Sequence, residues 1–280
     1  MLAFRRPLAT AAALTTLTLP AALVACTTPS ADNAQDDPLS IIASASPHAE
    51  ILEWIDQNDD SLTLDISLST DGAGSNAAVE NGSADANFFQ HLPYLRDWEV
   101  QTGKTLVNVA NVHFEPMSLY SEKIADVADI PDGATITVPS SPSNLARALL
   151  LLEANGLIEL DADLDPEAVS SIDLTRVSAN PHDFTIVPVD DILVIRSIQD
   201  DEVYGTIAST NYALEAGYDP ADDAIITESS VNNPYTNILV ASEQTKNDPR
   251  VEALAAQLTS ETTARWIREH YGNAVVPVNG

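Results

Sequence analysis

Hydrophobic and polar residues follow two different periods along this chain, which predicts both strands and helices. Leu62–Leu68 alternates apolar and polar positions, as a half-buried strand does. Short apolar runs predict further strands at Leu39–Ala45, Thr105–Val112, Met117–Tyr120, Thr135–Val138 and Phe184–Val187. Strands that alternate with helical segments are typical of an α/β protein with mostly parallel sheets.

Helical signals separate these strands. In the clearest segment, Asn144–Ala154, leucines recur at helical spacing, Ser143 can cap the start and Gly156 can end the helix. The other predicted helices are His48–Gln57, the run from Asp248 and Pro249 to Leu258, and the run from Ser260 to Gly272. Ligands of α/β sheets collect at strand ends and in clefts between lobes, so we expect a small-molecule site.

The N-terminal residues predict export and lipidation. Arg5 and Arg6 precede an uncharged stretch of Leu, Ala, Val and Thr, which is the pattern of a signal peptide, here residues 1–25. The run Leu23-Val24-Ala25-Cys26 resembles a bacterial lipobox, which implies acylation of Cys26, with palmitate as one acyl group. Residues 26–38 are rich in Thr, Ser, Asp, Asn and Pro and are expected to form a flexible tether.

Composition narrows the choice of partners. Asp and Glu number 42 against 12 Lys and Arg, which gives a formal net charge of −30. Nucleic acid requires basic contacts to its phosphates, so we expect no nucleic-acid partner. The hydrophobic fraction of 45% supports a substantial core, and the single cysteine, Cys26, excludes an internal disulfide.

Motifs for catalysis and cofactor binding are missing from the sequence. Gly72-Ala73-Gly74-Ser75 lacks the remaining residues of a phosphate loop and the order of a nucleophile elbow, so we interpret it as a turn. The five histidines are scattered, and none is paired at i, i+4 on a predicted helix. We therefore expect no enzyme, no cofactor and no metal. A metal-binding protein assembled from separate loops stays open as an alternative.

Several ordered segments carry a resemblance to a known family. Asn87–Leu95 reads Asn-Phe-Phe-Gln-His-Leu-Pro-Tyr-Leu, which is similar to the signature of the methionine-binding NlpA lipoproteins. Matching segments follow in order at Pro47–Leu52, Val112–Met117, Pro131–Ala134, Ser143–Leu149, Asn155–Ile158, Asn211–Gly217, Asn233–Asn237 and Gly272–Pro277. The resemblance covers nearly all of residues 39–280.

This resemblance implies a type II periplasmic-binding-protein fold, in which two α/β lobes enclose a ligand cleft. We place the first lobe at residues 39–130 plus 239–280 and the second at residues 131–238. The implied function is an extracytoplasmic solute-binding lipoprotein that delivers methionine or a related small amino acid to an ABC importer. The expected partners are the small-molecule ligand, the transporter permease and, through the lipid on Cys26, the bacterial cell membrane. We expect a monomer.

The resemblance also implies the ligand-binding residues. Arg147, near the start of its helix with Asn144, would bind the ligand carboxylate, and a guanidinium can do so with two parallel hydrogen bonds. Asn237 would bond the ligand backbone, and an aromatic wall would surround the side chain, where a thioether packs well on rings. The complete set of expected ligand-binding residues is Phe88, Phe89, His91, Asn144, Arg147, Ser209, Asn211 and Asn237.

Two positions depart from the family pattern. Gly72 stands where relatives usually carry an aromatic residue, and Ser209 stands where they usually carry Asn. A missing aromatic wall would make room in the cleft. Alternative ligands are therefore a methionine-containing dipeptide or another apolar amino acid, and an alternative role is a surface protein without transport function.

Overall fold

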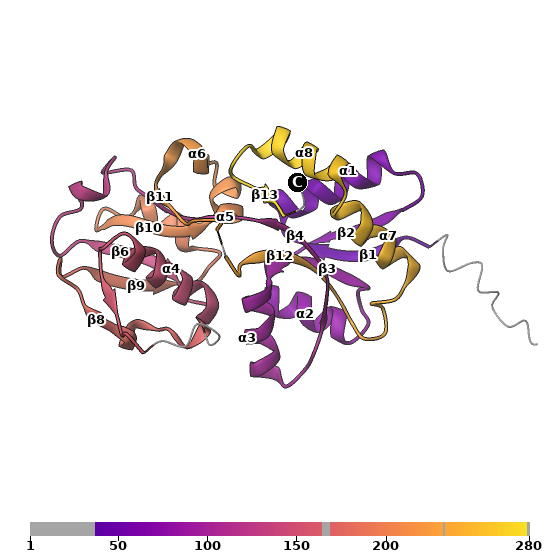
Figure 1. Ribbon diagram of the computed structural model, residues 1–280, viewed down its shortest axis with the longest axis horizontal. Helices are drawn as coiled ribbons and strands as arrows, with labels where there is room; N and C mark the ends of the chain where they lie inside the picture. Colours follow the sequence, from indigo (N-terminus) through magenta and orange to yellow (C-terminus); the bar gives the residue numbers. More distant parts are fainter. Residues whose placement is uncertain (1–36, 164–168, 232, 279–280) are drawn as a thin grey trace, which may run out of the picture. The chain divides into compact units, whose positions relative to one another are not determined.

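The computed structural model describes residues 37–163, 169–231 and 233–278 (Figure 1). The predicted signal peptide, the lipidation site Cys26 and most of the predicted tether lie outside these ranges. The strands are β1 Leu39–Ala43, β2 Leu64–Leu68, β3 Ala86–His91, β4 Val107–Phe114, β5 Met117–Tyr120, β6 Thr135–Pro139, β7 Glu159–Leu160, β8 Val177–Ala179, β9 Thr185–Val189, β10 Val203–Ser209, β11 Ala224–Thr227, β12 Thr236–Ala241 and β13 Val276–Pro277. The α-helices are α1 Glu50–Asn58, α2 Gly72–Glu80, α3 Leu92–Thr102, α4 Pro142–Ala154, α5 Thr210–Glu215, α6 Pro220–Asp223, α7 Pro249–Leu258 and α8 Glu261–Tyr271.

The first lobe is built on a six-stranded sheet with the order β13-β4-β12-β3-β1-β2. Strand β1 pairs in parallel with β2 and β3, whereas β12 runs antiparallel between β3 and β4. Helices α1, α7 and α8 lie over one face, and α2 and α3 lie over the other (Figure 1). Both faces are thus covered, and each has a hydrophobic cluster, one containing Ile41 and Leu254 and the other Val79 and Trp98.

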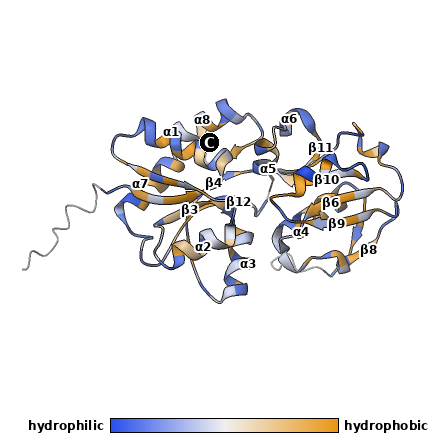
Figure 2. Ribbon diagram, turned by 180° about the vertical axis from the view of Figure 1, so that it is seen from behind, coloured by the Kyte–Doolittle hydropathy of each residue, from blue (hydrophilic) through white to orange (hydrophobic). Residues whose placement is uncertain are grey.

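The second lobe is built on a five-stranded sheet with the order β11-β5-β10-β6-β9. Strand β6 pairs in parallel with β9 and β10, and β5 runs antiparallel to β10 and β11. Helix α4 packs its leucines into the larger cluster of this lobe, which includes Leu149 and Ile136. Figure 2 shows hydrophobic residues concentrated along the strands of both sheets.

The predicted helices near the C-terminus are confirmed almost to the residue. Helix α7 begins after Asp248, whose side chain accepts a hydrogen bond from the Arg250 N–H, with Pro249 in the first turn. Helix α8 begins after Ser260, whose hydroxyl accepts from the Thr263 N–H. Such caps accept hydrogen bonds from backbone N–H groups that the first helical turn leaves unpaired. The cap residues therefore allowed the helix starts to be predicted from the sequence.

The sequence-based lobe boundary differs from the sheet pairing. Strand β5 fell within the predicted first lobe, residues 39–130, but it pairs with β10 and β11 of the second sheet. The chain therefore passes from one sheet to the other at Glu115 and Pro116, well before Pro131, and returns between β11 and β12, whose first residue is Thr236. A short apolar strand does not reveal from its own residues which sheet it joins.

The interpretation of Gly72–Ser75 as a turn was wrong. These residues form the first turn of helix α2, and the Asp71 side chain caps it by accepting from the Gly74 N–H. Glycine has a low helix propensity, so the two glycines of this segment favoured a turn over a helix. Burial of Asn76 and Val79 against the first sheet stabilises the helix instead.

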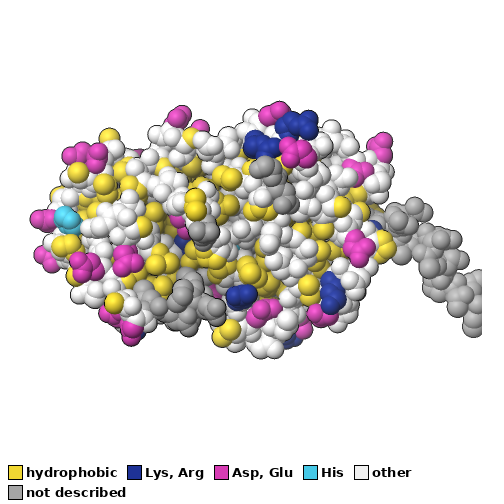
Figure 3. All heavy atoms as spheres, viewed as in Figure 1, with side chains coloured by type: hydrophobic (Ala, Val, Ile, Leu, Met, Phe, Trp, Pro, Cys, Tyr) yellow, Lys and Arg dark blue, Asp and Glu magenta, His cyan; other side chains and the backbone are white. Residues whose placement is uncertain are grey.

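Acidic side chains are scattered over the face of the molecule in Figure 3, and the basic side chains visible there lie mainly on the first lobe. Among the residues described, no helix has the length and apolar character needed to cross a membrane.

Candidate functional site

A cavity of about 420 Å³ lies where the carboxyl ends of the parallel strands of both lobes meet. Ser44, Ser69 and His91 follow or end β1, β2 and β3 of the first lobe. Ser140, Asp190 and Ser209 follow or end β6, β9 and β10 of the second lobe. Ligands of open α/β sheets bind at this edge, and the volume is within the usual range for small-molecule sites, about 300–1,000 Å³.

Six of the eight predicted ligand-binding residues line this cavity. They come from both lobes and are Phe89, His91, Asn144, Ser209, Asn211 and Asn237. The strand–helix junctions explain the clustering, because His91 is the N-cap of α3 and Ser209 is the N-cap of α5.

Phe88 is not part of the cavity wall. Its side chain is fully buried in the first-lobe core, edge-on to the rings of His48 and His113 at centroid distances of 4.7 and 5.4 Å. Phe89, the next residue of the strand, lines the cavity instead. The prediction that Phe88 lines the ligand site was wrong, because its ring packs into the core of the first lobe.

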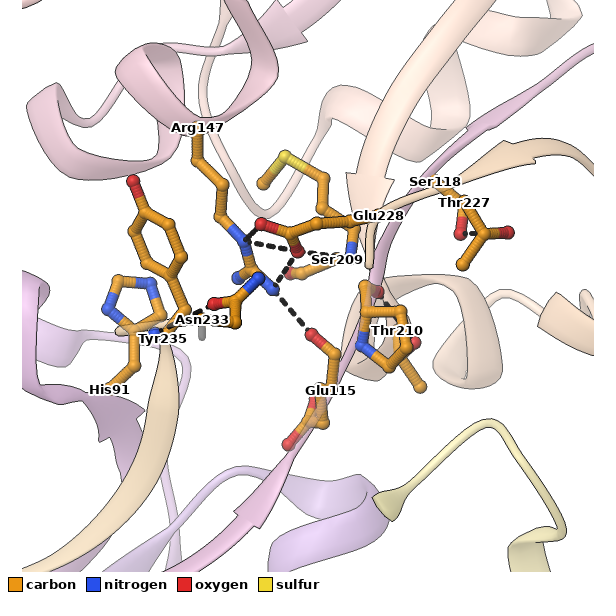
Figure 4. Close-up of polar contacts among 12 residues, drawn as sticks. His91, Glu115, Ser118, Arg147, Ser209, Thr210, Thr227, Glu228, Asn233 and Tyr235 are labelled. Atoms are coloured by element: carbon orange, nitrogen blue, oxygen red, sulfur yellow. Dashed lines mark hydrogen bonds and ion pairs between the residues drawn. The ribbon is translucent and has the colours of Figure 1, made fainter. Parts of the chain in front are cut away.

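Arg147 lies behind the cavity wall and is already paired. Its Nε and Nη2 donate to the Glu228 carboxylate at 2.6–3.1 Å, and Nη2 also donates to the Glu115 carbonyl at 2.6 Å. Figure 4 shows the guanidinium between Glu228 and the ring of Tyr235, whose centroid is 4.5 Å from Arg147 Cζ. Among the residues described, its hydrogen bonds use Nε and Nη2, and we consider Nη1 the donor for a further acceptor.

At the start of α4, hydrogen bonds of Ser143 and Asn144 join the second lobe to the first. His91 Nε2 lies 2.9 Å from Asn144 Oδ1, and Ser143 N donates to Asp97 Oδ2 at 2.9 Å. His91 Nδ1 accepts from the Tyr94 N–H, so Nε2 carries the ring hydrogen. Asn144 Nδ2 donates to Asp191, which also accepts from the Ser140 and Ser141 N–H groups at the start of α4.

The space above Gly72 is filled by aromatic rings from elsewhere. A Cβ at this position would lie 2.5 Å from Tyr94 Oη and 2.8 Å from Phe89 Cε2. The two rings meet edge to face at a centroid distance of 5.9 Å, and both line the cavity. An aromatic wall is therefore present without an aromatic residue at position 72.

Sequence reasoning assigned no role to the acidic lining of the cavity. Its carboxylates are Asp71, Glu115, Asp190, Asp191 and Glu215, and none of the described residues that line it is Lys or Arg. A glutamate directly before proline between two apolar strands, as at Glu115, was the one local signal that could have indicated this. The lining favours a ligand with a positively charged group over one that is only anionic.

Beneath the cavity, Glu115 lies between two buried histidines. His113 Nε2 is 2.7 Å and His48 Nε2 is 3.2 Å from Glu115 Oε1, and the Asn211 N–H donates to Oε2 at 3.0 Å. His48 Nε2 also lies 3.2 Å from Asn237 Oδ1, and its Nδ1 is 2.7 Å from Ser44 Oγ. Since Nε2 of His48 faces two oxygen acceptors, it carries the ring hydrogen, and Asn237 is left with its Nδ2 donors for the cavity.

His48, His113 and Glu115 also have the donor types of a zinc site, with ligand atoms within 4.8 Å of one another. The 2.7 Å contact is of hydrogen-bond length, and the carboxylate also accepts a backbone N–H. Hydrogen bonds therefore account for the contacts of Glu115 with both histidines, whereas Nδ1 of His113 is buried without a hydrogen-bond partner among the described residues.

The same network contains a serine, a histidine and a carboxylate in line: Ser44, His48 and Glu115. Burial lowers the pKa of His48 to about 4, with the Glu115 charge opposing the shift. A histidine with this pKa is a weak general base at neutral pH. The arrangement orients Asn237 rather than activating Ser44.

Stability should fall as the pH drops below neutral. Burial lowers the pKa of His48 to about 4, and that of His91 and His113 to about 3, from about 6.5. Below pH 6.5 these histidines bind protons in the unfolded chain but stay neutral in the folded protein. Each of them therefore lowers the free energy of unfolding by up to about 1.4 kcal/mol for every pH unit of acidification. Burial raises the pKa of Glu115, which offsets part of this loss.

Denaturant unfolding between pH 7 and pH 5 measures this effect. We expect His91→Gln to flatten the pH dependence by about one proton. The control His270→Gln changes a histidine that is exposed and lies outside this buried group. An unfolding free energy of the wild type that does not fall in this range contradicts the prediction.

Two α/β lobes joined by two chain crossings, with a cavity at the facing strand ends, are the architecture of periplasmic substrate-binding proteins. The chain belongs to the NlpA lipoprotein family, whose sequence model matches residues 39–279. The structure of an ABC transporter periplasmic substrate-binding protein from Coxiella burnetii has a TM-score of 0.79, 35% identity, and covers 86% of this chain and 100% of that chain.

Two further relatives are connected with methionine, one by its name and the other by the ligand in its structure. The methionine-binding lipoprotein MetQ of Bacillus subtilis (strain 168) is 32% identical over 242 residues, which is 85% of this chain and 87% of the relative. A nutrient-binding protein from Burkholderia cenocepacia, solved bound to methionine, has a TM-score of 0.80 and 30% identity, and covers 86% of this chain and 99% of that chain.

Proposed function

We propose that this protein is the extracytoplasmic solute-binding lipoprotein of an ABC importer, and that its ligand is methionine or a related apolar amino acid. The observation that carries the proposal is the cavity between the lobes, lined by His91, Asn144 and Asn237 and walled by aromatic rings. Membership of the NlpA family supports the same role.

The cavity has suitable groups for each part of an amino acid. Asn237 Nδ2 is a donor for the ligand carboxylate at the cavity wall, and the acidic lining provides acceptors for the ammonium. Arg147 Nη1 lies behind the wall and is proposed as a second donor for the carboxylate. Phe89 and Tyr94 provide a wall on which a thioether side chain can pack, at about 0.3–1.5 kcal/mol per contact.

Thermal unfolding of the soluble protein, starting after Cys26 and freed of any retained ligand, tests this proposal. A ligand at 100 times its dissociation constant adds about 2.7 kcal/mol to the free energy of unfolding. Stabilisation by methionine supports the proposed ligand. Stabilisation only by a methionine-containing dipeptide keeps the transport role and changes the ligand, whereas a panel of amino acids, short peptides and metal ions without effect removes the transport role.

We infer no catalytic role for this protein. The support is the binding-protein family and the low pKa of His48, which leaves Ser44 without an effective base. Hydrolysis of chromogenic esters or peptides by the wild type but not by Ser44→Ala would overturn this inference.

The membrane anchor is proposed to be the lipid on Cys26, and the working form is proposed to be a monomer. Exchanging Cys26 for serine should abolish labelling by a fatty-acid analogue in a bacterial host and move the protein from the membrane fraction to the soluble fraction. One lipidated cysteine with several acyl chains gives durable anchoring, because each buried methylene contributes about 0.8 kcal/mol. Undiminished labelling of the variant would exclude Cys26 as the lipidation site.

A further inference from the structure

Glu115 occupies a position that no other cavity carboxylate shares. It lies between β4 and β5, where the chain first passes from one lobe to the other. Its side chain is nearly fully buried, and it still contributes to the cavity lining. A carboxylate buried at this point requires partners for its charge.

Both lobes hold the Glu115 carboxylate. His113 and His48 of the first lobe lie at hydrogen-bond distance from Oε1, and the backbone N–H of Asn211 in the second lobe donates to Oε2. A carboxylate has about four acceptor sites. Contacts within the described part of the chain use three of them, and the site that remains is on Oε2.

Arg147 provides a positively charged group close to the main chain of Glu115. Arg147 Nη2 donates to the backbone carbonyl of Glu115, so the guanidinium contacts the main chain of the residue whose carboxylate lines the cavity. In a free α-amino acid the carboxylate and the ammonium are attached to the same carbon. A site for such a ligand needs a donor and an acceptor in the same part of the cavity, and the guanidinium of Arg147 lies against the main chain of the residue that carries the acceptor.

We propose that the free acceptor site on Glu115 Oε2 receives the α-ammonium of the ligand, which makes Glu115 a specificity-determining residue. This rests on the proposed amino-acid-binding function. His48 and His113 hold the carboxylate in place from the first lobe. Because Oε2 also accepts from Asn211, the bound ammonium and the second lobe share one oxygen of Glu115.

The test compares three ligands on the wild type by isothermal titration calorimetry. Methionine has both charged groups, methioninamide keeps the ammonium without the carboxylate, and 4-(methylthio)butanoate keeps the carboxylate without the ammonium. Hydrogen bonds to charged groups are strong enough that we expect 4-(methylthio)butanoate to bind at least tenfold more weakly than methionine. Equal affinity for these two ligands overturns the inference and leaves the transport role standing.

A variant series locates the acceptor. Glu115→Gln should reduce the preference for methionine over 4-(methylthio)butanoate at least tenfold. The matched control is Glu153→Gln on α4, whose carboxylate accepts a backbone N–H outside the cavity lining, and it should keep the full preference. A full preference in Glu115→Gln, or its loss in Glu215→Gln instead, assigns the ammonium elsewhere and overturns the inference.

The ligand comparison on the wild type needs no substitution, so it holds even if Glu115→Gln does not fold. If the wild type binds none of these ligands, nor any other amino acid, the proposed function fails and the inference falls with it.

Discussion

Arg147→Met is expected to lower the free energy of unfolding by about 3–5 kcal/mol and to weaken ligand binding at least a hundredfold. The stability effect arises because Arg147 is almost fully buried and Glu228 is only 14% exposed, so the variant leaves a mostly buried carboxylate without its partner. The binding effect arises because Arg147 Nη1 is proposed to hold the ligand carboxylate.

The double variant Arg147→Met/Glu228→Gln separates the two effects. Removing both charges removes the penalty of an unpaired carboxylate, so denaturant unfolding should show stability restored by at least half. Calorimetry should still detect no tight binding. A double variant that is stable and binds methionine like the wild type would show that Arg147 is a structural residue only.

Phe88→Ala and Phe89→Ala are expected to have opposite consequences, although the two residues are neighbours. Phe88 is fully buried between His48 and His113, so its truncation should cost about 3–5 kcal/mol in the free energy of unfolding. Phe89 is partly exposed and belongs to the cavity wall, so its truncation should cost less stability and more affinity.

Each phenylalanine variant serves as the control for the other. Denaturant unfolding measures the stability of both, and calorimetry at a temperature where both are folded measures their affinity. A weaker affinity in folded Phe88→Ala than in Phe89→Ala would mean that the strand faces the cavity with its other side.

Much of the fold was predictable because its signals are local. Asp248-Pro249 and Ser260 marked the starts of α7 and α8, and the leucine spacing of Asn144–Ala154 marked α4. These signals depend on hydrogen bonds and packing within a few turns of the chain. The start of α2 at Gly72 was missed because its stability comes from the sheet beneath it and not from its own residues.

Sheet membership was harder to predict than the strands themselves. Strand β5 matched its predicted range, Met117–Tyr120, yet it lies in the other lobe from the one expected. Strand β12 inserts antiparallel between β3 and β4, which are more than a hundred residues earlier in the chain. The spacing of hydrophobic residues predicts which face of a strand is buried, but it does not predict which strand it pairs with.

The resemblance to the NlpA lipoproteins predicted the polar cavity residues at strand ends, such as His91 and Asn237. The sequence carried no sign that Arg147 pairs with Glu228, which lies 81 residues away, or that Phe89 and Tyr94 fill the space above Gly72. The meeting of Glu115 and its chain neighbour His113 with His48 also depends on tertiary structure. Such contacts are made across elements, so neither spacing nor propensity reports them.

Isothermal titration calorimetry of the ligand-free wild type with methionine tests the central claim most directly. The account predicts saturable binding of one methionine per chain, and it predicts that Asn237→Ala, which removes the amide donors from the cavity, weakens this binding at least tenfold. Absence of binding by methionine, by other apolar amino acids and by methionine-containing dipeptides would contradict the claim that this cavity is an amino-acid site.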